Sequence, residues 1–131
     1  EPPMKRCVYE AEKAADQALL SVKNIIGYDE MGMELFLNEI SYNTMEDYLT
    51  QLFGETEGEK LSDYMKLIEM YFLCEGSIQQ MASRLFIHKN TVQYKLNKLW
   101  EITGKNIRVP SGAAVFAMAW KFYQYAVKSR R

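Results

Sequence analysis

The sequence predicts an all-α fold, a helical bundle, on three observations. Apolar residues recur at steps of three and four along most of the chain, which is the spacing of one helix face. Gly and Pro are sparse, at 7 and 3 of 131 residues, so few hairpin turns are expected. One short segment, residues 22–28, is typical of a strand, but the sequence offers it no partner strand.

The segment before residue 32 is predicted to be a helix followed by this candidate short strand. The helix has a stripe of small side chains that would let another helix approach closely, at Met4, Val8, Ala11, Ala15 and Ala18. Because a lone strand needs a sheet, we expect residues 1–31 to be the tail of a truncated upstream domain or a dimerisation helix. The opening EPPMKR, which has no initial Met, also favours a piece of a longer protein. Residues 32–131 are then a separate domain.

Three helices are expected between residues 32 and 76. The first spans residues 34–40. The second has Asn43 or Thr44 as its N-cap and ends at Gly54, and the acidic stretch GETEGE then forms an exposed loop. The third spans residues 60–75, and its apolar face consists of Leu61, Tyr64, Met65, Ile68, Tyr71 and Phe72.

Charged residues are sorted along the chain. Residues 1–75 contain 16 Asp or Glu and 6 Lys or Arg, whereas residues 76–131 contain 10 Lys or Arg and a single acid, Glu101. The formal net charge of −1 is therefore the sum over an acidic part, residues 1–75, and a basic part, residues 76–131. A basic surface attracts phosphate backbones because each neutralised phosphate releases condensed counterions. A nucleic-acid interface is thus expected in the basic part.

Residues 77–103, within the basic part, are predicted to form two helices joined by a tight turn. Ser77 is the expected N-cap of the first helix, with Gln80 as its capping-box partner. The inward face of this helix consists of Ile78, Met81, Ala82 and Leu85. Phe86 and Ile87 fill the turn, and the second helix begins near His88 and ends at Gly104. Its inward face consists of Val92, Leu96, Leu99 and Ile102.

The last segment is predicted to be a break at residues 110–112 followed by a helix over residues 113–128. This helix is apolar around most of its circumference, so it belongs either in the core or in a subunit interface. We assign it mainly to the core, and we expect its basic residues, Lys121 among them, on a solvated face.

A helix-turn-helix that binds DNA keeps one face of its second helix in the core and inserts the other face into the major groove. The outward side chains here offer cations for phosphates or guanine, amides for adenine and hydroxyls for either. The candidate DNA-binding residues are His88, Lys89, Asn90, Thr91, Gln93, Tyr94, Lys95, Asn97 and Lys98. Tyr94 could equally be a core residue packed on the turn, and His88 is expected to cap the helix or contact a phosphate. Arg84 is a weaker candidate for a backbone contact.

The stretch ASRLFIHKNTVQYKLNKLWEITG closely resembles the C-terminal helix-turn-helix of the PucR/CdaR family of transcriptional regulators, and it is similar to the helix pair of Fis-type proteins. The family stretch is A-x-x-L-[FY]-[IV]-H-[RK]-N-T-[LV]-x-Y-[RK]-L, followed by E-[LI]-T-G. The resemblance covers about residues 32–125, more loosely outside the motif. Lys89 and Lys95 stand where the family often has Arg, which keeps the charge and loses the bidentate fork.

The resemblance implies the C-terminal part of a metabolite-responsive regulator. In the family this module follows a sensory region that often ends in a GGDEF-like domain, of which residues 1–31 would be the tail. The expected effector is a small metabolite such as a sugar diacid or a purine derivative, bound by that sensory region. The expected partners of the chain itself are double-stranded DNA and a second copy in a homodimer.

The residue inventory argues against an enzyme. The chain has one His, two Cys without zinc or disulfide spacing, and no Gly-rich phosphate loop, so we expect no catalytic residues, metal or cofactor. The run AAVFAMAW is too short to span a bilayer, so we expect no membrane contact. The two cysteines are most simply reduced thiols, so we expect a cytoplasmic protein. Two alternatives stay open, a helical protein-interaction module that has lost DNA binding and a nucleoid-type binder without sequence preference.

Overall fold

The computed structural model describes residues 31–128, and these residues contain six α-helices and no strand. The all-α prediction is confirmed for this part of the chain. The candidate strand and the small-residue helix before it lie outside the described residues. The chain divides into two compact units at the boundary between Ser41 and Tyr42. The first unit contributes α2 (Met31–Leu37), which begins and ends three residues before the predicted helix over residues 34–40.

The second unit begins with α3 (Tyr42–Phe53), whose buried residues Met45, Leu49 and Phe53 recur every four positions on one face. The helix starts before both predicted caps, so Asn43 and Thr44 lie in its first turn. The Tyr48 hydroxyl donates to the Val115 carbonyl oxygen at 3.1 Å, and the Tyr48 ring meets Phe122 edge to face, with centroids 5.1 Å apart. These contacts fix α3 against the C-terminal part of the chain.

Helix α4 (Glu59–Leu73) buries Leu61, Met65, Leu67 and Ile68. It ends two residues earlier than predicted because Glu75 and Gly76 both have left-handed backbones, with φ of 52° and 81°. A right-handed helix cannot continue through such residues. The predicted inward residues Tyr64, Tyr71 and Phe72 are only half-buried.

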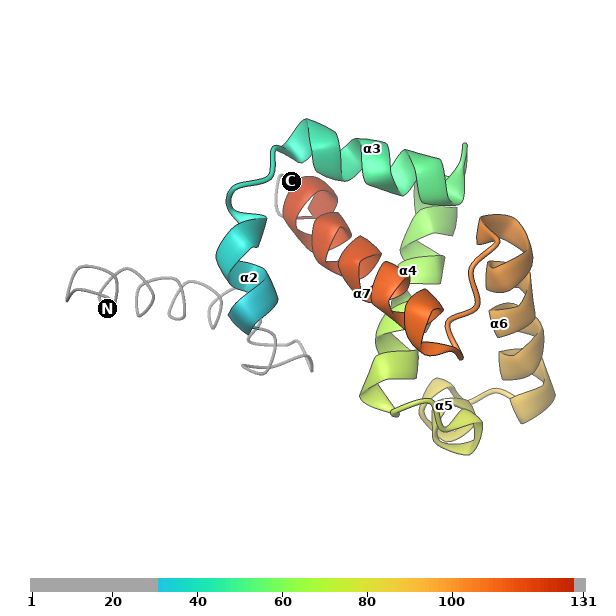
Figure 1. The fold of residues 1–131 in the computed structure, drawn as a ribbon. Coiled ribbons are helices and arrows are strands. Elements are labelled where there is room, and N and C mark those ends of the chain that lie inside the picture. The colour runs from blue at the N-terminus through green and yellow to red at the C-terminus, as the bar shows by residue number, and fades with distance from the viewer. Residues whose placement is uncertain (1–30, 129–131) are drawn as a thin grey trace. The chain divides into compact units, whose positions relative to one another are not determined.

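Helices α5 (Ile78–Leu85) and α6 (Lys89–Thr103) pack on each other, and both contact α4. In Figure 1, α7 (Pro110–Phe122) crosses α4 and runs beside α3, and α6 lies at one edge of this unit. The centre contains Trp120, Phe116, Ile68, Met81 and Leu99, each no more than 1% exposed. The last helix therefore belongs to the core, as predicted, where it packs on α3 and α4.

The start of α7 corrects the sequence prediction. Residues 110–112 do not break the chain, because Pro110 occupies the first turn of the helix, where a missing N–H costs nothing. Gly112 is buried against the backbone of Asn106, and an added Cβ would lie 1.8 Å from the Asn106 carbonyl oxygen. The glycine thus permits a close approach of α7 to the preceding loop.

The end of α7 brings two further corrections. The α-helix ends at Phe122, and the chain continues to Lys128 as a π-helical segment, η2 (Tyr123–Lys128). Lys121, expected on a solvated face, is 2% exposed, and its Nζ lies 5.2 Å from the centroid of the Trp120 ring. Burial beside an aromatic face is favourable for a cation that has lost water.

Candidate nucleic-acid interface

The first helix of the pair begins and ends as its sequence predicts. The Ser77 hydroxyl accepts the backbone N–H of Gln80 at 3.2 Å, which satisfies one of the free donors at the start of α5. Met81 is fully buried, and Ala82 and Leu85 are half-buried. The Ala82 carbonyl accepts the N–H of Ile87 at 3.1 Å, which closes the turn onto the helix.

The turn depends on Phe86, which has a left-handed backbone with φ of 59° and ψ of 42°. Its side chain is 92% exposed, so the ring contributes almost nothing to the core. The sequence predicted that both Phe86 and Ile87 would fill the turn, and only the half-buried Ile87 does so.

His88 is the N-cap of α6, one of the two roles predicted for it. Its Nδ1 accepts the backbone N–H of Asn90 at 3.0 Å. The His88 carbonyl accepts the N–H groups of Thr91 and Val92 at 2.9 and 3.2 Å. Three backbone donors at the start of α6, those of Asn90, Thr91 and Val92, therefore have partners.

Helix α6 has two distinct faces. Val92, Leu96 and Leu99 are buried, each at most 1% exposed, as the spacing predicts. Ile102, predicted on the same face, is instead 37% exposed. At 100° per residue it lies about 80° away from Val92, which places it at the rim of the buried stripe. All the sequence-predicted site residues are exposed on α6 or at its cap, namely His88, Lys89, Asn90, Thr91, Gln93, Tyr94, Lys95, Asn97 and Lys98.

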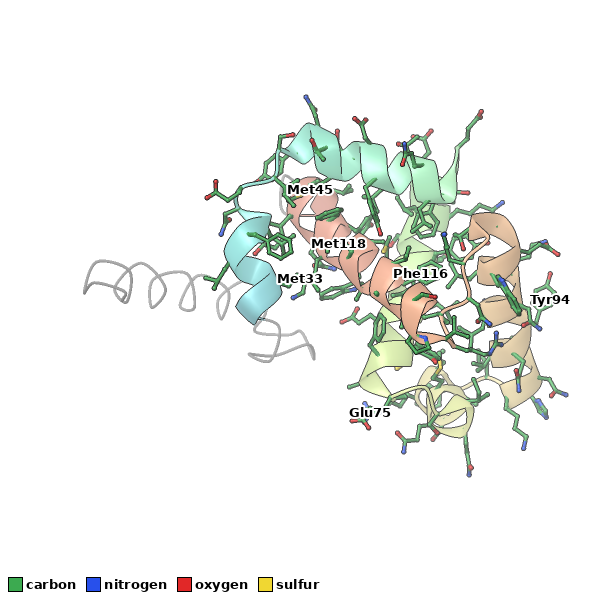
Figure 2. The ribbon with its side chains drawn as sticks, viewed as in Figure 1. Met33, Met45, Glu75, Tyr94, Phe116 and Met118 are labelled. Atoms are coloured by element: carbon green, nitrogen blue, oxygen red, sulfur yellow. The ribbon has the colours of Figure 1, made fainter. Side chains whose placement is uncertain are left out.

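The position of Tyr94 excludes one of the two predictions made for it. Its side chain is 64% exposed, so it is not a core residue. Figure 2 shows Tyr94 on α6, clear of the interior position that Phe116 occupies on α7. A hollow of about 210 Å³ separates it from α4, and its lining includes Tyr64, Tyr94, Lys95 and Lys98. Burial raises the pKa of Tyr64 above its ordinary value, which keeps this phenol neutral and able to donate.

Lys98 forms the ion pair of this face. Its Nζ lies 3.3 Å from Oε1 of Glu101, one turn further along the helix. The hydrogen bond to Glu101 raises the pKa of Lys98, so the ammonium keeps its charge. Both side chains are solvated, so the pair contributes little to stability and can open towards another anion.

Arg108 is a member of this surface that the sequence analysis missed. It lies in the loop after α6, outside the helix pair, and its Nη2 donates to Oδ1 of Asn97 at 3.2 Å and to Oε1 of Gln93 at 3.4 Å. Its backbone N–H donates to Oδ1 of Asn106 at 3.0 Å, which shapes the loop. No local pattern could have indicated this contact, because it joins residues 11 and 15 positions apart through a loop.

Residues 31–128 contain neither a candidate metal site nor a candidate membrane span. Within this range no three His, Cys, Asp or Glu residues lie where they could hold a metal ion together. None of the helices described is both long enough and apolar enough to cross a bilayer.

Comparison with known proteins gives a family for this domain. Residues 64–122 match the model of the PucR C-terminal helix-turn-helix domain. The chain is 30% identical to an uncharacterized protein of Haemophilus influenzae over 63% of its length and to one of Bacillus subtilis over 73%. It is 34% identical to an uncharacterized protein of Mycobacterium tuberculosis over 42% of its length.

The chain spans only 22%, 26% and 13% of these three relatives. No solved structure is significantly similar to it. The matched residues run from the middle of α4 to the end of α7, so they include the helix pair and the core that supports it. Residues 64–122 are therefore a helix-turn-helix domain of the PucR C-terminal family.

Proposed function

We propose that this chain binds double-stranded DNA in a sequence-specific manner, as the C-terminal part of a transcriptional regulator, with α6 in the major groove. The observation that carries the proposal is the two-faced α6. Val92, Leu96 and Leu99 are buried on one face, and the other face presents amides, hydroxyls and ammonium groups from a capped helix. A helix held in this way places base-reading side chains with little loss of entropy on binding.

The polar side chains on this face divide by chemistry into two groups. Amide, hydroxyl and phenol groups suit base edges or the groove wall, and we assign this role to Asn90, Thr91, Gln93, Tyr94 and Asn97. Ammonium groups suit phosphate oxygens, and we assign this role to Lys89, Lys95 and Lys98. His88 can add a phosphate contact through Nε2, since its Nδ1 is used by the cap.

Two further features of the proposal concern the complete protein. We propose a homodimer on two half-sites about one helical turn apart, because a single helix-turn-helix buries too little surface for tight operator binding. The matched part of the chain makes up only 22% and 13% of two curated relatives, which supports a separate effector-binding region elsewhere in the protein. The family resemblance points to a sugar diacid or purine derivative as the effector.

The test starts from a pool of random duplexes. The chain is bound to the pool at low salt, the bound DNA is sequenced through successive rounds, and affinity is measured on the enriched and on a scrambled duplex. We expect one enriched sequence, bound at least about a thousandfold more tightly than scrambled DNA. Tight binding without enrichment would support a nucleoid-type binder. No binding at low salt would support the alternative of a helical protein-interaction module that has lost DNA binding.

A further inference from the structure

We propose that Arg108 is a positioning residue that determines base specificity by fixing the side chains of Gln93 and Asn97. The inference deepens the proposed function, on which it rests. Arg108 belongs to the loop between α6 and α7, so it lies outside the helix pair.

The geometry gives the two amides a defined orientation. One guanidinium nitrogen, Nη2, donates to the side-chain oxygens of Asn97 at 3.2 Å and Gln93 at 3.4 Å. A guanidinium has only donors, so the atom of each amide that faces it must be the oxygen. The NH₂ groups of both amides are thereby turned away from Arg108, and each amide loses the freedom to flip.

This orientation selects the chemistry that the amides can read. Their free NH₂ groups are donors, which pair with acceptors on base edges in the major groove, such as N7 and O6 of guanine, N7 of adenine and O4 of thymine. Gln93 and Asn97 are one helical turn apart on α6, so the two donors can address neighbouring base pairs. We therefore infer that the site preferred by this domain has such acceptors at the positions under these two residues.

The loop is held rigidly enough for this role. The Arg108 backbone N–H is bonded to Asn106, and Ile107 beside it is 1% exposed and anchors the loop in the core. The contact of Gly112 with the Asn106 backbone fixes the other side of the loop. The loop thus holds the guanidinium over α6. Only Nη2 makes the two amide contacts, so the other N–H groups of Arg108 take no part in them.

The experiment compares Arg108→Ala and Arg108→Lys in the full chain, using the duplex enriched by the wild-type chain and a scrambled duplex. Lys keeps the charge and has a shorter reach, so it separates positioning from attraction to phosphate. We expect the ratio of the affinity for the enriched duplex to that for the scrambled duplex to fall about five- to tenfold in both variants. A loss of this size corresponds to about one amide–base contact. The salt dependence of Arg108→Lys should equal that of wild type. Sequences re-selected by Arg108→Ala should lose preference at the same base positions as those of Gln93→Ala and Asn97→Ala.

Two controls make the outcome specific. Lys105→Ala removes a charge from the same loop without touching the amides, and it should keep the wild-type affinity ratio. Adding Arg108→Ala to the Gln93→Ala/Asn97→Ala pair should change the ratio no further, because the side chains that Arg108 positions are gone. A wild-type ratio in Arg108→Lys, or equal losses on both duplexes in Arg108→Ala, would overturn the positioning role. A wild-type chain that enriches no sequence would instead refute the proposed function.

Discussion

The imidazole Nδ1 of His88 accepts the backbone N–H of Asn90 at 3.0 Å, and this bond closes the first turn of α6. The only histidine of the chain therefore organises the helix that carries the proposed DNA contacts. It does so with an acceptor that is unusual at this position, where Ser, Thr, Asp and Asn are the preferred residues.

Removing this acceptor should destabilise the domain. We expect His88→Ala to lower the free energy of unfolding by about 0.5–2 kcal/mol, the usual cost of losing an N-cap, measured by urea denaturation followed by circular dichroism. His88→Asn supplies another acceptor and should recover most of the loss. If Asn were no better than Ala, the capping bond would contribute nothing to stability.

Gly112 should tolerate no side chain. The Cβ of Gly112→Ala would meet the Asn106 carbonyl oxygen at 1.8 Å, so α7 or the loop must move. We expect a loss of about 1–3 kcal/mol or more in unfolding free energy, as for other overpacked sites. Ser111→Ala, at the exposed neighbouring position, is the matched control and should unfold close to wild type. Equal midpoints for the two variants would show that the close approach is not required.

Gln93 and Asn97 should contribute to the preference of the domain for particular DNA sequences. We expect Gln93→Ala or Asn97→Ala to cost about 1–3 kcal/mol on the enriched duplex and little on a scrambled one, measured by fluorescence anisotropy at fixed salt. A variant that loses equally on both duplexes has lost a backbone contact, and its residue would leave the base-reading group.

Lys89, Lys95 and Lys98 should behave in the opposite way. Replacing any one by Ala should weaken binding to all duplexes alike and lower the slope of log affinity against log salt by about one unit. An unchanged slope would show that the side chain points away from the duplex.

Glu101 should compete with DNA phosphate for Lys98, because the two side chains already form an ion pair. Glu101→Gln removes the only acid of residues 76–131 and should tighten binding to every duplex. The same gain in a Lys98→Ala background would mean that Glu101 acts through the general field rather than through Lys98.

Assembly can be tested by sedimentation velocity of the full chain and of a version without residues 1–28. We expect a dimer for the full chain and a monomer for the shorter one, because the stripe of small residues in the predicted first helix suits helix pairing. Monomers in both cases would refute pairing through this segment. Dimers in both would place the interface within residues 29–131.

Local signals in the sequence determined the helix pair. Ser77, His88 and Gly104 were predicted at the ends of α5 and α6, and each caps its helix as expected. Capping and burial of one helix face depend on residues within four positions of each other, so a single sequence contains the information. The buried stripe Val92, Leu96 and Leu99 was correct for the same reason.

Only the tertiary structure decided the features that join distant segments. Arg108 reaches Asn97 and Gln93 because the loop after α6 folds back over that helix, and no spacing indicates such a return. Gly112 looked like a helix breaker, and its role is visible only when α7 meets the Asn106 backbone. Lys121 looked solvated, yet packing places it in the interior beside Trp120. Composition and periodicity specify which residues prefer burial, whereas the three-dimensional path of the chain determines which groups meet.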